Sequence, residues 1–145
     1  GLYDNDMLVS CVTFDKPRFN KKYEWELVRY ANKLNTQVLG GFSKLLKHFE
    51  RKHQPKNILT YSEARLFQNN TYEKSGFTYL YTSEPGYFYI KKGTPVGSRH
   101  KFQKHKLQKL LPKFDVSLSE WDNMKANGYD RVWDCGNRVF VKQYN

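Results

Sequence analysis

The sequence predicts an α/β (α+β) fold in which a mixed sheet is flanked by helices, followed by a basic helix and a C-terminal hairpin. Three observations predict it. Residues 7–14 and 23–31 alternate their side chains with the period of two that is typical of strands. Residues 42–53, which follow a pair of glycines, carry apolar side chains at helical spacing, and residues 57–62 form a short apolar segment. A strand, a helix and another strand in this order predict a parallel βαβ unit.

The first half of the chain is expected to supply most of the sheet and the helix that covers it. Residues 1–14 predict a pair of strands with a turn at residues 4–6, and residues 15–22 predict a loop. One face of the helix is apolar and is expected to face the core, whereas another face is basic. The apolar stripe consists of Phe42, Leu45, Leu46 and Phe49, and the basic face carries Lys44, Lys47 and Arg51.

The second half is expected to begin with a short helix and a hairpin. Residues 69–75 predict the helix, which ends at Gly76, and residues 77–92 predict a hairpin that turns at residues 84–86. We expect the tyrosines of the hairpin to form cross-strand pairs, with stacking on splayed nucleotide bases as the alternative. These tyrosines are Tyr79, Tyr81, Tyr87 and Tyr89.

Two further helices and a second hairpin are predicted toward the end of the chain. Residues 98–111 predict a basic helix that ends before a proline. Ser117 and Glu120 have the spacing of a capping box, which predicts a helix that stops at an Asn-Gly pair. Residues 129–143 predict a closing hairpin that turns at its Cys-Gly-Asn segment. The side chains that the basic helix is expected to bury are Phe102, Leu107, Leu110 and Leu111.

A length of 145 residues and an aromatic content of 17% fit one folded domain. We expect a core over residues 1–90 and an extension over residues 91–145, and we expect the chain to be part of a longer protein. Two cysteines, Cys11 and Cys135, are too few for a disulfide framework, which favours a reducing, cytoplasmic compartment. No apolar run approaches the roughly 20 residues of a membrane span, so no membrane partner is expected.

The net charge of +11 is the strongest compositional signal. A basic domain of this size is attracted to polyanions, and nucleic acid is the most abundant of them. An anionic membrane surface or an acidic protein is the alternative partner. Residues 91–113 contain eight Lys or Arg and two His but no Asp or Glu. A merely solvated helix face usually mixes both signs of charge, so this segment favours contact with a nucleic acid.

Candidate DNA contacts follow from this segment and from the basic face of the first helix. Lysines make point-charge contacts to phosphates, whereas Arg, Gln and Asn side chains can read base edges. The expected base-reading residues are Arg65, Asn69, Arg99 and Gln103. The full set of expected DNA contacts, Asn69 aside, is Lys44, Lys47, Arg51, Arg65, Arg99, Lys101, Gln103, Lys104, Lys106 and Lys109.

No metal site and no nuclease centre are expected in this chain. A metal-dependent nuclease needs several carboxylates that converge on Mg²⁺, and the acids here are scattered along the sequence. The histidines form two pairs with a spacing of five residues, which places the members of each pair on different helix faces. We therefore expect His48, His53, His100 and His105 to be solvated rather than to bind zinc.

The order of strand, glycine turn, helix, strand and short helix resembles the second half of the GNAT (Gcn5-related N-acetyltransferase) fold. In that family a Q/R-x-x-G-x-G/A segment begins the central helix and holds the pyrophosphate of acyl-CoA with backbone N–H groups. Gln37, Gly40 and Gly41 supply the matching loop, whereas Phe42 stands where Gly or Ala is expected. A benzyl group there is expected to crowd the pyrophosphate.

In the same family the tyrosine of a Y-x-x-x-G-F pattern protonates the departing thiolate, and Tyr72 has that spacing here. Because the phosphate loop departs from the pattern, we expect no cofactor and no catalytic residue. The alternative is that acetyl-CoA or another acyl-CoA binds to the glycine loop and that Tyr72 acts as general acid.

A second resemblance covers nearly the whole chain. Residues 23–49, 58–77, 85–90, 98–107 and 128–137 together resemble a C-terminal domain of phage-encoded mobile endonucleases, which are similar to homing endonucleases and often carry a nuclease of the very-short-patch-repair type. The resemblance implies a non-cleaving accessory domain that binds double-stranded DNA beside an N-terminal nuclease domain of the same chain, in the bacterial host cell. The alternative is an active N-acyltransferase that modifies a nucleic acid or a protein bound to it.

Overall fold

The computed structural model of the protein describes residues 1–66 and 71–144 and divides into two compact units. Unit 1 comprises residues 1–83 and 137–145, and unit 2 comprises residues 84–136. The chain therefore passes between the units twice. The domain expected over residues 1–145 thus contains two compact units, each with a sheet and a core of its own.

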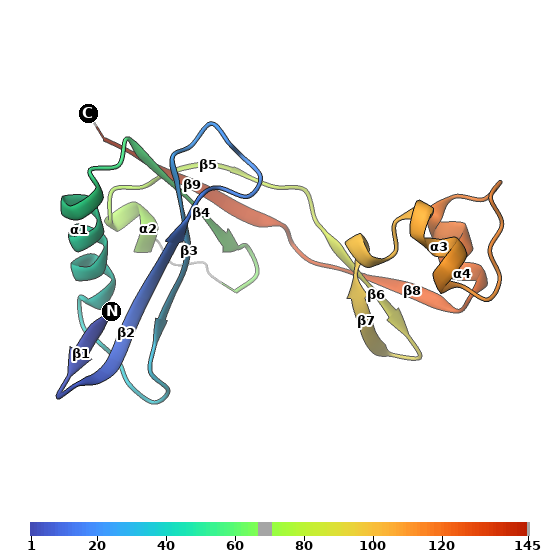
Figure 1. Cartoon of the computed structure of the whole chain (residues 1–145), viewed down its shortest axis with the longest axis horizontal. Coiled ribbons are helices and arrows are strands. Elements are labelled where there is room, and N and C mark those ends of the chain that lie inside the picture. Colours follow the sequence, from blue (N-terminus) through green and yellow to red (C-terminus); the bar gives the residue numbers. More distant parts are fainter. Residues whose placement is uncertain (67–70, 145) are drawn as a thin grey trace. The chain divides into compact units, whose positions relative to one another are not determined.

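The described residues of unit 1 form a six-stranded sheet and two helices (Figure 1). The elements are β1 (Leu2–Asp4), β2 (Met7–Asp15), β3 (Trp25–Asn32), α1 (Gly41–His53), β4 (Asn57–Glu63), α2 (Thr71–Lys74), β5 (Thr78–Thr82) and β9 (Asn137–Gln143). The strand order is β1-β2-β3-β4-β9-β5, and only β3 and β4 pair in parallel. The predicted βαβ unit and the α+β class are therefore confirmed, in a sheet that is mostly antiparallel.

Helix α1 packs on the sheet through the apolar stripe that the sequence predicts. Phe42, Leu45, Leu46 and Phe49 are all buried, and the ring of Phe49 stacks on Phe14 of β2 with centroids 3.6 Å apart. Burial of one such side chain stabilises a fold by about 1.5–3 kcal/mol, so the stripe holds α1 firmly on the sheet. The buried cluster consists of Leu27, Phe42, Leu46, Phe49, Ile58, Phe77 and Phe140.

The described residues of unit 2 form a three-stranded sheet with short helices. The elements are β6 (Tyr87–Lys91), β7 (Thr94–Ser98), the 3₁₀ helix η1 (Arg99–Lys101), α3 (Lys104–Leu110), α4 (Glu120–Ala126) and β8 (Tyr129–Trp133). The strand order is β7-β6-β8, and both pairs are antiparallel. The core of this unit consists of Tyr89, Phe102, Leu107, Leu111 and Met124.

Both predicted hairpins are wrong. Strand β5 pairs with β9, whereas β6 pairs with β7 and β8, so the chain leaves one sheet for the other at each expected turn. The segment after Pro85 does not turn back because the N–H of Asp134 donates to the carbonyl of Gly86 (2.9 Å). The Asp134 carboxylate accepts hydrogen bonds from the N–H groups of Gly86 and Gly136, both at 2.8 Å. The expected tyrosine pairs are therefore absent: Tyr79 lies opposite Phe140, Tyr81 opposite Val139, Tyr87 opposite Trp133 and Tyr89 opposite Arg131.

The predicted basic helix over residues 98–111 is only partly correct. Its first residue, Ser98, ends β7 and pairs with Phe88, and α3 begins only at Lys104. The strand β7 was not predicted, because Pro95 and two glycines hide its short alternation. Of the four side chains expected to be buried, Leu110 is 50% exposed, since the short helix turns only Leu107 toward the core and Leu111 follows it in extended conformation.

Helix α4 starts two residues later than the capping-box prediction. Ser119, rather than Ser117, is the N-cap, and its hydroxyl accepts a hydrogen bond from the N–H of Asp122 (3.1 Å). Ser117 instead binds the carboxylate of Asp115 (2.6 Å). Glu120, the expected partner in the box, accepts hydrogen bonds from two tyrosine hydroxyls of β6. The predicted end of the helix, at the Asn-Gly pair, is confirmed.

We expect Asn123→Ala to destabilise unit 2 by about 1–3 kcal/mol, because it removes a buried amide that ties the backbone of Asp115 to the start of α4. The amide nitrogen of Asn123 donates to the carbonyls of Asp115 (2.8 Å) and Ser119 (3.0 Å), and its oxygen accepts from the N–H of Asp115 (2.8 Å). Urea unfolding of the variant measures the loss. Gln108→Ala, on the exposed face of α3, is the matched control and should change the free energy of unfolding by less than about 0.5 kcal/mol.

Candidate functional site

Helix α3 presents an exposed face of cationic and polar side chains. Leu107, in the middle of the helix, is fully buried. Helical spacing places His105 and Lys109 on the opposite side, with Lys104 and Lys106 at the flanks, and all four are exposed. The face that α3 turns to solvent therefore carries three lysines, together with His105, Gln108 and the half-exposed Leu110.

Five carboxylates of unit 2 accept hydrogen bonds within the unit, and none of the five forms an ion pair with a lysine of α3 among the described residues. The hydrogen bonds from Ser117, and to a lesser extent the charge of Lys104, lower the pKa of Asp115. Glu120 accepts from the hydroxyls of Tyr87 (3.1 Å) and Tyr89 (2.9 Å) and lies 3.8 Å from the guanidinium of Arg99. Burial and the bond to Glu120 raise the pKa of Tyr89 well above its usual value, so this hydroxyl stays a donor. The other engaged acids are Asp115, which binds Ser117, Asp122, which binds Ser119, Asp130, which accepts from the N–H of Arg131, and Asp134.

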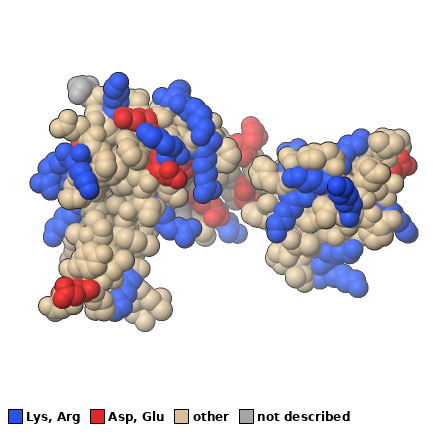
Figure 2. Space-filling model, in the orientation of Figure 1, with Lys and Arg blue, Asp and Glu red and all other residues tan. Residues whose placement is uncertain are grey.

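The cationic side chains of residues 99–109 differ in whether an acidic side chain of the protein already pairs with them. Arg99 is tied to Glu120 and lies over the ring of Tyr87, with 5.5 Å to the centroid. Within the described residues, the lysines have no ion pair, although Lys106 donates to the carbonyl of His100 (2.8 Å). Figure 2 shows Lys and Arg side chains gathered on the face of unit 2 that is in view, on the right. The lysines without an ion pair are Lys101, Lys104, Lys106 and Lys109.

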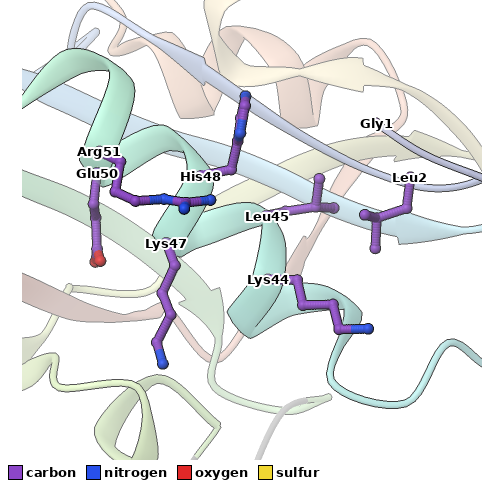
Figure 3. Close-up of a pocket in the computed structure, with 8 residues that line it drawn as sticks. All are labelled: Gly1, Leu2, Lys44, Leu45, Lys47, His48, Glu50 and Arg51. Carbon is purple, nitrogen blue, oxygen red and sulfur yellow. The ribbon is translucent and has the colours of Figure 1, made fainter.

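Unit 1 carries a second cationic face, on α1. Lys44, Lys47 and Arg51 are exposed, as the sequence predicts, and they line a hollow of about 620 Å³ beside β1 (Figure 3). Arg65 follows β4 and pairs with Glu63 at 3.2 Å, so its guanidinium is already partly neutralised. The ten expected DNA contacts thus fall into four in unit 1 and six in unit 2.

Two of the expected base-reading residues have structural roles, and one cannot be placed. Arg99 binds Glu120, as described above, and Gln103 is the half-buried N-cap of α3. Asn69 lies outside the residues that the structure describes. Because the lysines rather than the base-reading candidates are free of ion pairs, the surface is better suited to phosphate contacts than to sequence readout.

A feature that the sequence did not reveal is a cleft in unit 1 where β3 and β4 separate. The two strands pair only from Trp25/Ile58 to Leu27/Thr60. At the last paired position the hydroxyl of Thr60, which is fully buried, donates to the carbonyl of Leu27 (3.0 Å). Beyond it lies a cleft of about 560 Å³, lined by Val28, Arg29, Tyr30, Phe42, Tyr61, Ser62, Glu63, Thr71 and Tyr72.

The predicted glycine loop leads into the first turn of α1. Gly40 adopts φ +67°, and a Cβ built there would meet nothing within 4 Å, so the loop is open on that side. The N–H of Gly41 donates to Val38 and that of Lys44 to Gly40, and no side chain caps the helix. Within the described residues, the remaining N–H groups of the first turn are available to a ligand or to solvent.

Two aromatic side chains connect this helix start to the cleft. Phe42, expected to crowd a pyrophosphate, is 8% exposed and belongs to the core-facing stripe of α1. Tyr72 lines the cleft and is half-buried against Phe42, Phe77 and Phe140, with ring centroids 5.3–5.9 Å apart. Tyr72 therefore packs against the core and also faces the cleft, as a proton donor to a ligand would.

No three His, Cys, Asp or Glu side chains of the described residues lie close enough together to hold a metal ion. No helix of the described chain is long and apolar enough to cross a membrane. A scan of the sequence against models of protein families finds no match, and a search of curated proteins finds no similar sequence.

We expect Thr60→Val to destabilise unit 1 by about 1–3 kcal/mol, because the buried carbonyl of Leu27 loses its hydrogen bond at the fork. The substitution preserves side-chain shape, so packing alone predicts almost no change. Thr78→Val, on the exposed strand β5, serves as the control. Equal free energies of unfolding for the two variants would show that the hydroxyl does not hold the fork.

Proposed function

We propose that this protein binds the phosphate backbone of double-stranded DNA through the exposed face of α3 and the preceding turn. The observation that carries this proposal is the imbalance within unit 2. Within the described residues its lysines have no ion pair, while five of its carboxylates accept hydrogen bonds from tyrosine and serine hydroxyls and from backbone N–H groups. When such lysines neutralise phosphates, the counterions condensed on the DNA are released, which favours association.

The chemistry of these side chains predicts binding with little sequence preference. Lysine ammonium groups on flexible stems position a protein on phosphates but do not read base edges. The resemblance to C-terminal domains of phage mobile endonucleases supports the same function. On this proposal the domain is non-cleaving and holds DNA for a nuclease domain elsewhere in the parent chain, in the cytoplasm of the host bacterium.

The α3 triple variant combines Lys101→Gln, Lys104→Gln and Lys109→Gln. It should bind duplex DNA about 500-fold more weakly at 0.1 M salt, because each lost phosphate contact lowers the salt slope by about 0.9. The slope of log K against log salt should become less steep by about 2.7. Fluorescence anisotropy with a labelled duplex, repeated over a salt series, measures both quantities.

The control is Lys22→Gln, Lys52→Gln and Lys74→Gln combined, which removes the same charge from exposed sites of unit 1. Its slope should change far less. If both triple variants lose affinity equally, net charge rather than the α3 face governs binding, and the proposal fails. Thermal unfolding of both variants confirms that the fold is retained.

A second candidate function, acyl transfer from acyl-CoA on a GNAT-like fold, is favoured by the fork between β3 and β4. The cleft begins where parallel pairing stops, so the edges of both strands offer backbone groups to an extended, amide-bearing ligand. The open turn at Gly40 and the uncapped first turn of α1 fit a pyrophosphate. Gln37, Gly40 and Gly41 would hold that group, and Tyr72 would donate a proton to the leaving sulfur.

Val28→Trp should abolish binding of acetyl-CoA if the cleft is the cofactor site, because the indole fills the space beside β4. Val28 is 45% exposed, so the larger side chain does not disturb the core. Leu8→Trp, at a strand position that is 44% exposed and outside the cleft, is the matched control. Isothermal titration should give 1:1 binding for the native chain and the control, and absence of heat from the native chain would remove this candidate.

A further inference from the structure

The hollow beside α1 is cationic on its helix side and apolar on its floor. Lys44, Lys47, His48 and Arg51 lie at the i, i+3, i+4 and i+7 positions of the helix, a single stripe on the side away from the core. Leu2 of β1 and Leu45 of α1 form the floor, and Figure 3 shows these two side chains next to each other. We name this feature the α1 hollow.

The one acid of the α1 hollow does not neutralise its cations. The carboxylate of Glu50 is 2.7 Å from the ammonium of Lys142 and accepts a hydrogen bond from the hydroxyl of Tyr144. Burial and this contact raise the pKa of Tyr144, so the hydroxyl remains a donor to an ionised Glu50. Figure 3 shows Glu50 directed away from the side chain of Arg51. The stripe therefore keeps its positive charge.

Helix stability does not explain the cations at the start of the stripe. The first turn of α1 contains Lys44 and no acidic residue, although the positive end of the helix dipole favours acids there. Arg51, in the last turn, lies where a cation is favourable. Residues that break a local rule of stability are expected where function requires them, so Lys44 points to an anionic partner.

The shape of the α1 hollow indicates what kind of anion fits. In Figure 3 the ends of Lys44, Lys47 and His48 spread in different directions from the helix instead of converging on one point. Such a spread suits successive charges of a chain better than a single phosphate. A neighbouring depression shares Leu2 and Lys44 with the hollow and adds Gln37 and Tyr3, which is 67% exposed. Grooves that bind single-stranded nucleic acid combine cationic side chains, which contact the phosphates, with aromatic rings, on which the bases stack. The α1 hollow and its neighbour have both kinds of side chain, beside the apolar Leu2.

We propose that the α1 hollow binds single-stranded nucleic acid, with phosphates on Lys44, Lys47 and Arg51 and bases against Leu2 and Tyr3. A duplex buries its bases in the stack and offers no base face to such a floor, whereas a single strand offers both. This site is separate from the proposed duplex contact of α3 and does not depend on it. The protein thus has one surface for paired DNA and another for an unpaired strand.

The double variant Lys47→Gln, Arg51→Gln tests the site. Fluorescence anisotropy measures its affinity for a labelled oligo(dT) of about 12 nucleotides and for a duplex of the same length. Two lost phosphate contacts on a single strand should weaken oligo(dT) binding by about 25-fold at 0.1 M salt and reduce the salt slope by about 1.4. Duplex affinity should change little. Tyr3→Ala in the same assay should weaken oligo(dT) binding and leave the salt slope unchanged, because stacking releases no counterions.

The control variant is Lys22→Gln with Lys52→Gln, which removes equal charge and includes a lysine of the same helix outside the hollow. The inference is overturned if oligo(dT) affinity survives the test variant, if the control loses as much, or if duplex and single-strand affinities fall together. The α3 proposal fails on a different measurement: it is wrong if the α3 triple variant binds duplex DNA as tightly as the native chain does. Urea unfolding checks that all variants keep the native stability.

Discussion

The constraint on which the account depends is that unit 2 uses its carboxylates to build its own fold. Glu120 holds two tyrosine hydroxyls and Arg99, and Asp134 holds the two glycine N–H groups where the chain enters and leaves the unit. Within the described residues, none of these acids forms an ion pair with a lysine of α3. The lysines of α3 therefore keep their charge at the surface, where we propose that duplex DNA contacts it.

In unit 1, too, one set of side chains stabilises the fold and another set stays charged at the surface. The apolar stripe of α1 fixes which side of the helix faces the sheet, and this fixes the outward direction of Lys44, Lys47 and Arg51. Glu50, which lines the same hollow, forms its ion pair with Lys142 of β9. The packing that stabilises α1 also places its start beside the fork of β3 and β4, where the cleft opens. One helix thus serves the core, a cationic hollow and the mouth of a cleft.

What could be predicted from the sequence is what depends on neighbouring residues. The stripe of α1, the βαβ unit and the end of α4 at an Asn-Gly pair follow from periodicity and local backbone preference. The hairpin predictions were wrong because Pro85, Gly86 and Gly136 are residue types typical of turns. The N–H groups of both glycines instead donate to the carboxylate of Asp134, which in the case of Gly86 is distant in sequence. The fork was not predictable either, because it depends on where two strands distant in sequence cease to pair.

Protection of lysines from chemical labelling tests the central claim most directly. The native chain is reductively methylated with and without a saturating DNA duplex, and modification of each lysine is quantified by mass spectrometry. The account predicts that duplex DNA protects Lys101, Lys104 and Lys109 while Lys22 and Lys74 react as in the free protein. Equal protection at all these positions, or none at the α3 face, would contradict it.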